Sequence, residues 1–252
     1  MSFRQDLQAV MPFRGNVRRL VIANVVIWIV CVLILSNFVL RNNQINLWFG
    51  FVPLRFFTKF WVWQPFTYMF IHADNIFHIL FNMLMLWWVG SELETYWGGR
   101  YFLFYYFTCG IGAALIYCTG VFIYYWFTGN VSVLHAPMIG ASGAIFGLLL
   151  AYGVLFGERV ILFLFLFPMK AKYFVMIIGG IALMNLLSQG PTSEVASLAH
   201  LGGLVVGWII MKSGPKWRDF LMKRRNRAHG RKLKLVVDND RRDGRGPSRY
   251  WN

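Results

Sequence analysis

Four polar side chains that could together carry out hydrolysis lie within apolar parts of the sequence. Ser142 stands in "GASGAIFG", His200 in "AHLGG", and His78 and Asn82 in "HILFN". His78 and Asn82 are four residues apart, which places both on one face of a helix. Strongly polar side chains in apolar spans are costly, so they usually face a cavity or a partner. We therefore expect the four to share one site.

The chemistry that needs this set is nucleophilic acyl transfer. A serine hydroxyl is a weak nucleophile until a base takes its proton. We expect Ser142 to be the nucleophile and His200 its base, and later the acid that protonates the leaving amine. Donors must also stabilise the oxyanion of the tetrahedral intermediate. The Asn82 amide, the ring N–H of His78 and the backbone N–H of Ser142 could supply them.

A third catalytic member is not evident. Asp74 precedes the second apolar helix and is expected to cap it, and Glu194 lies in a loop before His200. Neither carboxylate is well placed to orient the histidine, so the sequence predicts a Ser–His dyad. Phe146 is one helical turn after Ser142 and lies on the same face. We expect its ring to stack on His200 and fix the orientation of the imidazole.

Glycines surround the candidate serine and histidine. Gly140 and Gly143 leave room for a peptide carbonyl, while Gly143–Gly147 and Gly203–Gly207 form two small-xxx-small pairs that let helix backbones approach in lipid. Such glycines are most often packing residues alone. Only their combination with the polar side chains favours a catalytic site.

Composition is typical of a membrane protein. Hydrophobic residues make up 58% of the chain and charged residues 14%, with a mean hydropathy of +0.52, whereas charged residues are about 25% of a soluble domain. The net charge is +15, but fourteen of the 25 Lys and Arg lie between Lys212 and Arg249. This distribution indicates a basic cytoplasmic tail near anionic lipid, not a nucleic-acid partner.

The three cysteines indicate no disulfide framework and no metal site. Cys31, Cys109 and Cys118 all fall within apolar segments, and no CxxC spacing occurs. We interpret them as helix-packing residues, and we expect no cofactor.

Six apolar windows approach the roughly 20 residues that a membrane-spanning helix needs. They cover about 20–40, 75–90, 101–126, 142–157, 171–188 and 198–212. The first is too long for a signal-peptide core and lacks a small-x-small cleavage site, so it should remain as the first span. The run Ile161–Pro168 is too short to span and should connect the fourth and fifth spans. The predicted fold class is an all-α polytopic membrane protein, a bundle of six transmembrane helices.

Basic residues predict the orientation and the limits of the membrane domain. With the N-terminus in the cytoplasm, all but three of the 25 basic residues lie on the cytoplasmic side. Six spans then leave both termini in the cytoplasm. We expect a cytoplasmic segment at 1–19, a membrane domain at 20–212 and a basic cytoplasmic tail at 213–252. In this orientation the four site residues all lie in the outer part of their helices, at similar depth.

The chain resembles the rhomboid family of intramembrane serine proteases, over about residues 15–212. The resemblance rests on "HILFN", "GASG" and "AHLGG" in that order, and on "WQPFTYMFIH" before the second span. It implies the six-span rhomboid fold of prokaryotic type, with Ser142 as nucleophile and His200 as base. It assigns His78, Asn82 and the Ser142 backbone to the oxyanion site.

Two positions differ from the family pattern. Phe146 stands where family members often have tyrosine, and Gln64 stands where an arginine commonly follows the tryptophan. The resemblance further implies cleavage of transmembrane segments of other membrane proteins, in contact with membrane lipids, by a multi-pass protein of a bacterial plasma membrane. It suggests that substrate enters beside the fifth span, with the 189–197 loop as a movable cap.

Two other functional classes remain open. A rhomboid-like protein that binds membrane clients without cutting them would tolerate loss of Ser142 or His200, yet both are present with the oxyanion residues. A transporter would spread polar groups through the depth of the membrane, whereas spans three and five have no charged side chains in their middles. The sequence therefore favours the protease.

Overall fold

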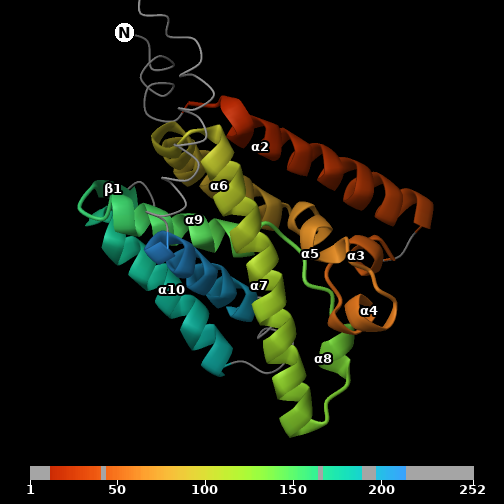
Figure 1. Ribbon diagram of the computed structural model, residues 1–252. Coiled ribbons are helices and arrows are strands. Elements are labelled where there is room, and N and C mark those ends of the chain that lie inside the picture. The colour runs from red at the N-terminus through yellow and green to blue at the C-terminus, as the bar shows by residue number, and fades with distance from the viewer. Residues whose placement is uncertain (1–11, 41–43, 164–166, 189–196, 214–252) are drawn as a thin grey trace, which may run out of the picture. The chain divides into compact units, whose positions relative to one another are not determined.

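The computed structural model describes residues 12–40, 44–163, 167–188 and 197–213 (Figure 1). Within these ranges, three helices are long and apolar enough to cross a membrane: Gly15–Val32, Ile76–Trp97 and Gly99–Thr128. Three shorter apolar helices follow, namely α9 (Ser142–Leu155), α10 (Ala171–Ser188) and the last helix, Ser197–Ser213. The six helices coincide with the six apolar windows, which confirms an all-α membrane bundle.

Several helices extend beyond their apolar windows. The first begins as α2 (Gly15–Ile27), before residue 20, and continues as the π-helix η1 (Trp28–Leu40). The second, α6 (Ile76–Trp97), runs past residue 90, and the third is α7 (Gly99–Thr128). The start of α2 and the end of α6 are joined by hydrogen bonds from backbone N–H groups of α2 to Glu94, so apolar character alone underestimates the length of these two helices.

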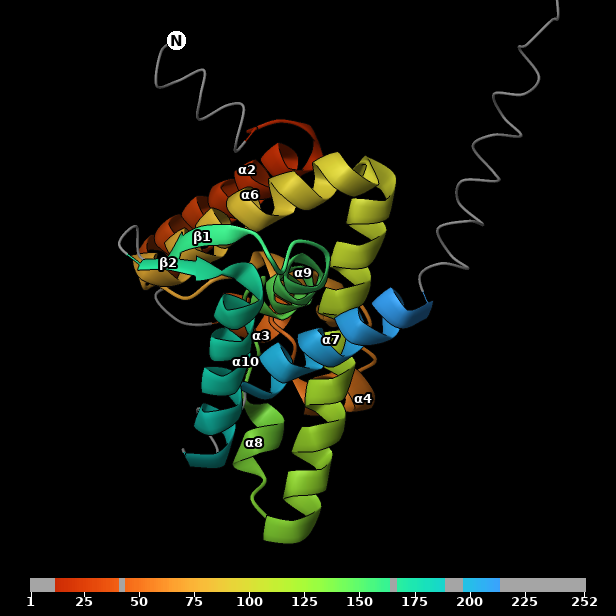
Figure 2. The same cartoon turned by 90° about the vertical axis from the view of Figure 1, so that its left-hand side faces the viewer.

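Helix α9 occupies the centre of the bundle. It contacts α6, α7 and α10, and Figure 2 shows it nearly end-on between them. Its buried residues lie on all sides of the helix and are mostly small or aliphatic: Gly143, Ala144, Ile145, Gly147, Leu148, Leu149, Ala151 and Tyr152. A helix that is apolar all round is expected to be enclosed by others.

The last helix packs against α9 backbone to backbone, as its glycines predict. A Cβ placed on Gly203 would lie 1.9 Å from the carbonyl oxygen of Gly143. A Cβ on Gly207 would lie 3.2 Å from the Cα of Gly147. Larger residues would force these helices apart. Because the two contacts follow each other in the same direction along both helices, the N-terminal ends of the two helices meet.

The long connection between η1 and α6 contains several short helices. These are α3 (Gln44–Phe49), α4 (Pro53–Thr58), α5 (Gln64–Thr67) and the 3-10 turn η2 (Tyr68–Phe70). The buried Gln64 side chain joins them. Its oxygen accepts a hydrogen bond from the Val52 N–H at 3.1 Å, and its amide donates to the Leu47 carbonyl at 3.0 Å. Gln64 thus stabilises this connection by hydrogen bonds to the backbone.

A short α8 (Ser132–His135) lies between α7 and α9 in the sequence and contacts α4.

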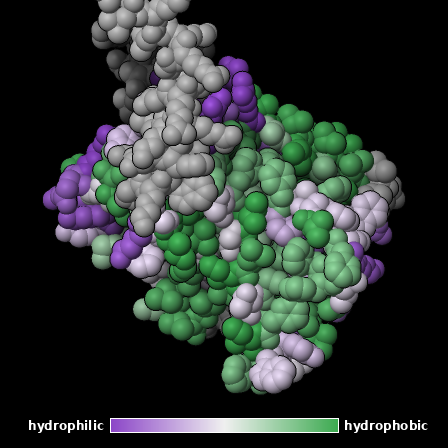
Figure 3. Space-filling model, in the orientation of Figure 1, coloured by the Kyte–Doolittle hydropathy of each residue, from purple (hydrophilic) through white to green (hydrophobic). Residues whose placement is uncertain are grey.

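The connection between α9 and α10 is an antiparallel hairpin of β1 (Val160–Phe163) and β2 (Phe167–Lys170). The run predicted as a connector therefore has regular structure. Hydrophilic side chains gather at this hairpin in Figure 3, whereas the surface over α2 and α7 is largely apolar.

Two glutamates at the end of α6 have partners far away in the sequence. Glu92 pairs with Arg159 and accepts a hydrogen bond from the Tyr152 hydroxyl at 3.1 Å. The Glu94 carboxylate accepts hydrogen bonds from two backbone N–H groups in the first turn of α2, which it caps. Both glutamates thus join segments that are distant in the sequence, so their contacts depend on how the helices pack.

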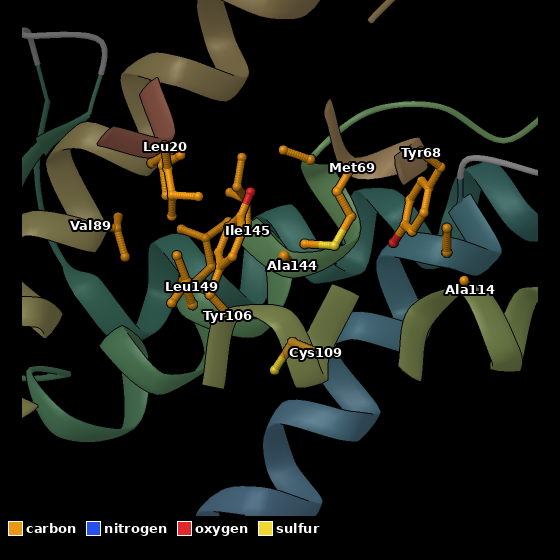
Figure 4. Close-up of a cluster of buried hydrophobic side chains, with 14 of the residues drawn as sticks. Leu20, Tyr68, Met69, Val89, Tyr106, Cys109, Ala114, Ala144, Ile145 and Leu149 are labelled. Carbon is orange, nitrogen blue, oxygen red and sulfur yellow. The ribbon is translucent and has the colours of Figure 1, made fainter. Parts of the chain in front are cut away.

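The hydrophobic core lies around α9. Figure 4 shows side chains from α2, η2, α6, α7 and α9 meeting there, among them Leu20, Met69, Val89, Tyr106 and Ile145. Cys109 and Cys118 are buried in α7, and none of the three cysteines, all of them among the described residues, forms a disulfide bond. This dense core holds the N-terminal end of α9 in place.

Candidate active site

Ser142 and His200 lie side by side at the junction of α9 and the last helix. Ser142 is the first residue of α9, and its Oγ lies 2.8 Å from Nε2 of His200. Both residues are half-buried. The glycine contacts between the two helices make this approach possible across 58 positions of sequence. At this distance the imidazole can accept the hydroxyl proton.

The ring of Phe146 stacks on the His200 imidazole, as predicted. Their centroids are 4.1 Å apart and their planes differ by 4°. Among the described residues, His200 has no hydrogen bond to a carboxylate. Glu194 and the predicted cap at 189–197 fall largely outside the described residues. Within those residues, the stacked ring is thus the contact that restrains the tilt of the imidazole.

His78 faces the serine from α6. Its Nδ1 accepts a hydrogen bond from the backbone N–H of Ala73 at 3.2 Å. In a neutral imidazole, one nitrogen accepts and the other carries the proton. The Ala73 contact therefore assigns the proton to Nε2, the nitrogen that an oxyanion would need.

Gly140 leaves an opening between His78 and Ser142. Its φ is +111°, a region that favours glycine. A Cβ there would lie 2.9 Å from His78 Nε2 and 3.9 Å from Ser142 Oγ. The missing side chain thus leaves space beside both groups. The Ser142 backbone N–H is also available, because the first N–H groups of a helix have no partner within it.

Asn82 lies one turn further along α6 and is buried. Its Nδ2 donates to the His78 carbonyl at 2.7 Å, while its Oδ1 has no partner among the described residues. One N–H of the amide is therefore occupied by the helix backbone. The second N–H remains for an oxyanion.

These side chains line one cavity of about 610 Å³. Its lining includes Ser142, His200, His78, Asn82, Gly140, Gly143 and Phe146. Every predicted site residue except Gly203 is thus brought to this cavity, and Gly203 lies behind it against the backbone of Gly143. The cavity also reaches between α6 and α10, where Phe81, Met85, Phe174 and Ile178 line it.

The residue that caps the N-terminus of α6 differs from the one predicted from the sequence. Asp74 was expected to cap this helix, but the cap is Asn75, whose Oδ1 accepts from the Phe77 N–H at 2.9 Å. An Asn at this position satisfies the free N–H as well as an Asp does. Two backbone contacts to the site were not predicted: the Ala73 N–H donates to His78 Nδ1, and the Tyr68 carbonyl accepts from the Gly140 N–H at 2.9 Å. Tyr68 lies in the quoted segment "WQPFTYMFIH", but the identity of a side chain does not reveal what its backbone contacts.

The sequence model of the rhomboid domain family matches residues 59–213, more than half of the chain. The chain belongs to the rhomboid family. Its rhomboid relatives include the mitochondrial Rhomboid protein 1 of Saccharomyces cerevisiae, which is 31% identical over 162 residues, 63% of this chain and 44% of the relative. They also include two bacterial proteins that are named proteases.

Rhomboid protease GluP of Bacillus subtilis is 32% identical over 148 residues, 58% of this chain and 25% of the relative. Rhomboid protease GlpG of Salmonella choleraesuis is 32% identical over 133 residues, 50% of this chain and 45% of the relative. The chain spans less than half the length of each of these rhomboid relatives. Family and apolar helices together identify a multi-pass membrane protein.

Proposed function

We propose that this rhomboid protein is an intramembrane serine endopeptidase with a Ser142–His200 dyad. The observation that carries the proposal is the 2.8 Å approach of Ser142 Oγ to His200 Nε2 in a cavity shared with His78 and Asn82. A merely structural serine–histidine contact would need neither an adjacent cavity nor further donors. The names of GluP and GlpG as rhomboid proteases agree with this function.

The reaction begins when Ser142 Oγ attacks the carbonyl carbon of the scissile peptide bond and its proton passes to His200 Nε2. The resulting oxyanion accepts hydrogen bonds from His78 Nε2, the Asn82 amide and the Ser142 backbone. Collapse breaks the C–N bond, and His200 gives its proton to the leaving amine. Water then attacks the carbonyl carbon of the acyl ester and gives a proton to His200 Nε2. As the ester bond breaks, His200 returns this proton to Ser142 Oγ.

Transmembrane segments of other membrane proteins are the proposed substrates. Regular helices hide their carbonyl groups, so a cleavable segment must contain helix-weakening residues. Access beside α10 is supported by Phe81 and Met85 of α6 and Phe174 and Ile178 of α10, which line the cavity. Joining α6 to α10 with a bifunctional crosslinker should slow cleavage of an embedded substrate. Unchanged cleavage would contradict entry between these helices.

The proposed orientation places both termini in the cytoplasm of a bacterium, with the protein in the plasma membrane and the 213–252 tail near anionic lipid. A membrane-impermeant thiol reagent should then modify a Ser132→Cys variant in intact spheroplasts. It should modify a Lys212→Cys variant only after the membrane is opened. The reverse pattern would contradict the orientation.

A fluorophosphonate probe tests the proposed activity. We expect the purified wild-type protein to be labelled and to cleave single-span substrates, with the cleaved bond identified from product masses. Ser142→Ala and His200→Ala should lose both activities, because each removes one half of the dyad. Ser132→Ala, at an exposed serine in α8, is the matched control and should retain both.

Two outcomes would overturn the proposal. Labelling that persists in Ser142→Ala would show that another residue reacts with the probe. Absence of both labelling and cleavage in a folded wild-type protein would instead favour a protein that binds membrane clients without cutting them.

A further inference from the structure

We infer that Trp28 is a positioning residue for the oxyanion site, acting through Ala73 and His78. This inference rests on the proposed protease function. Trp28 lies at the junction of α2 and η1, far from Ser142 in sequence, and is not among the residues that line the cavity. Its connection to the site consists of two successive hydrogen bonds.

The first hydrogen bond holds the chain just before α6. Trp28 Nε1 donates to the carbonyl oxygen of Ala73 at 2.9 Å. Trp28 is buried, with 8% of its surface exposed. A buried indole N–H needs a partner, and Ala73 supplies it. The first membrane helix is thereby attached to the segment that leads into α6.

The second hydrogen bond links the same residue to the imidazole. The N–H of Ala73 donates to His78 Nδ1 at 3.2 Å, which assigns the proton to Nε2. Ala73 precedes the helix cap Asn75 and lies outside the helical hydrogen-bond ladder. Its backbone orientation therefore depends on contacts such as the one from Trp28. Loss of that contact would let the Ala73 N–H turn away from the imidazole.

The consequence concerns catalysis more than substrate binding. A reoriented Ala73 would leave His78 free to rotate or to exchange tautomers, so that Nε2–H would face the oxyanion for only part of the time. Stabilisation present only in the transition state affects kcat, whereas ground-state binding affects KM. Oxyanion donors act in this way, and small displacements reduce their contribution.

Replacement of Trp28 by phenylalanine tests the inference. Trp28→Phe keeps an apolar ring but removes the N–H donor together with part of the volume of the buried indole. We expect kcat on a transmembrane substrate to fall about tenfold with KM nearly unchanged, since one hydrogen bond contributes on the order of a tenfold effect. Trp63→Phe is the matched control, because Trp63 Nε1 also donates to a backbone carbonyl, that of Trp48, at 3.0 Å. It should keep full activity.

A double-mutant cycle separates a positioning role from a general structural one. In a His78→Ala background, Trp28→Phe should cause no further loss, because the group that it positions is absent. The rate of fluorophosphonate labelling serves as the second readout if turnover by His78→Ala is too slow. Thermal unfolding midpoints identify variants that fail to fold.

The inference is overturned if Trp28→Phe is as active as Trp63→Phe, or if it loses equal activity with and without His78. A change in KM alone would also contradict it. Failure of the proposed protease function is distinguishable, because the wild-type protein itself would then neither cleave nor react with the probe.

Discussion

The ring of Phe146 lies parallel to the imidazole of His200, with centroids 4.1 Å apart and planes within 4°. Phe146 stands one turn after Ser142 on α9, so one helix carries both the candidate nucleophile and the surface against which its base rests. Within the described residues, His200 has no carboxylate partner. In the proposed mechanism, this aromatic contact would orient the imidazole, as an aspartate does in a catalytic triad.

Truncation of the Phe146 side chain should lower the proposed activity, because the imidazole of His200 would then be less restrained in its orientation. We expect Phe146→Ala to reduce kcat by about ten- to a hundredfold, because aromatic stacking contributes roughly 0.5–1.5 kcal/mol and the imidazole also gains freedom. Phe146→Tyr keeps the ring and should remain within about threefold of wild type. Phe127→Ala, at the exposed end of α7, is the control. Full activity of Phe146→Ala would contradict this role.

The contact between α9 and the last helix should be intolerant of a single methyl group. Gly203→Ala places a Cβ 1.9 Å from the Gly143 carbonyl oxygen, which forces the helices apart. We expect a loss of at least about 3 kcal/mol of stability, beyond ordinary overpacking, together with loss of activity. Gly180→Ala in α10 meets nothing within 4 Å and should be neutral or slightly stabilising. Thermal unfolding in detergent compares the two variants.

Removal of the Glu94 carboxylate should loosen the attachment of α2 to α6. Glu94 accepts hydrogen bonds from the backbone N–H groups of Asn16 and Val17 at 2.8 and 2.9 Å. We expect Glu94→Ala to cost about 2 kcal/mol, since it leaves these donors without a partner, and Glu94→Gln to cost less. The unfolding midpoint measures both.

Glu158→Gln is a suitable control for that experiment. Hydrogen bonds from Lys170 and Lys172 lower the pKa of Glu158 to about 2, yet the group is exposed to solvent. Exposed ion pairs contribute little, so the midpoint should hardly change. A larger effect from Glu158→Gln than from Glu94→Ala would contradict our view of both sites.

His72 should make stability depend on pH. Burial, with a smaller effect of the neighbouring His78, lowers the pKa of His72 from its usual value of 6.5 to about 3. In the unfolded chain His72 is protonated below about pH 6.5, whereas in the folded protein it stays neutral down to about pH 3. The free energy of unfolding is therefore unaffected by His72 above about pH 6.5. It decreases as the pH falls below that value, by up to about 1.4 kcal/mol per pH unit.

The measurement is the unfolding midpoint between pH 7.5 and 4.5 in wild type and in His72→Phe. The variant should show a smaller decline towards acid pH. His135→Gln is the matched control, because His135 is exposed in α8 and its replacement should leave the decline unchanged. Identical declines in wild type and His72→Phe would show that His72 does not contribute.

Much of the architecture could be predicted because hydropathy and periodicity are local properties. The apolar windows located the six helices of the bundle, and the four-residue spacing of His78 and Asn82 placed both on one face of α6. The small-xxx-small pairs also predicted the contact of α9 with the last helix, because only glycine allows backbones to approach so closely. The limits of the predicted segments 1–19, 20–212 and 213–252 stay a prediction.

The sequence by itself determined which helices form and which side chains could carry the chemistry. The tertiary structure decided how these groups are held: Asn75 caps α6 in place of Asp74, Glu92 pairs with Arg159, and Trp28 reaches the carbonyl of Ala73. These contacts join backbone atoms or side chains that are distant in the chain. Such distances depend on how the helices pack against one another, which a local pattern of residues does not contain.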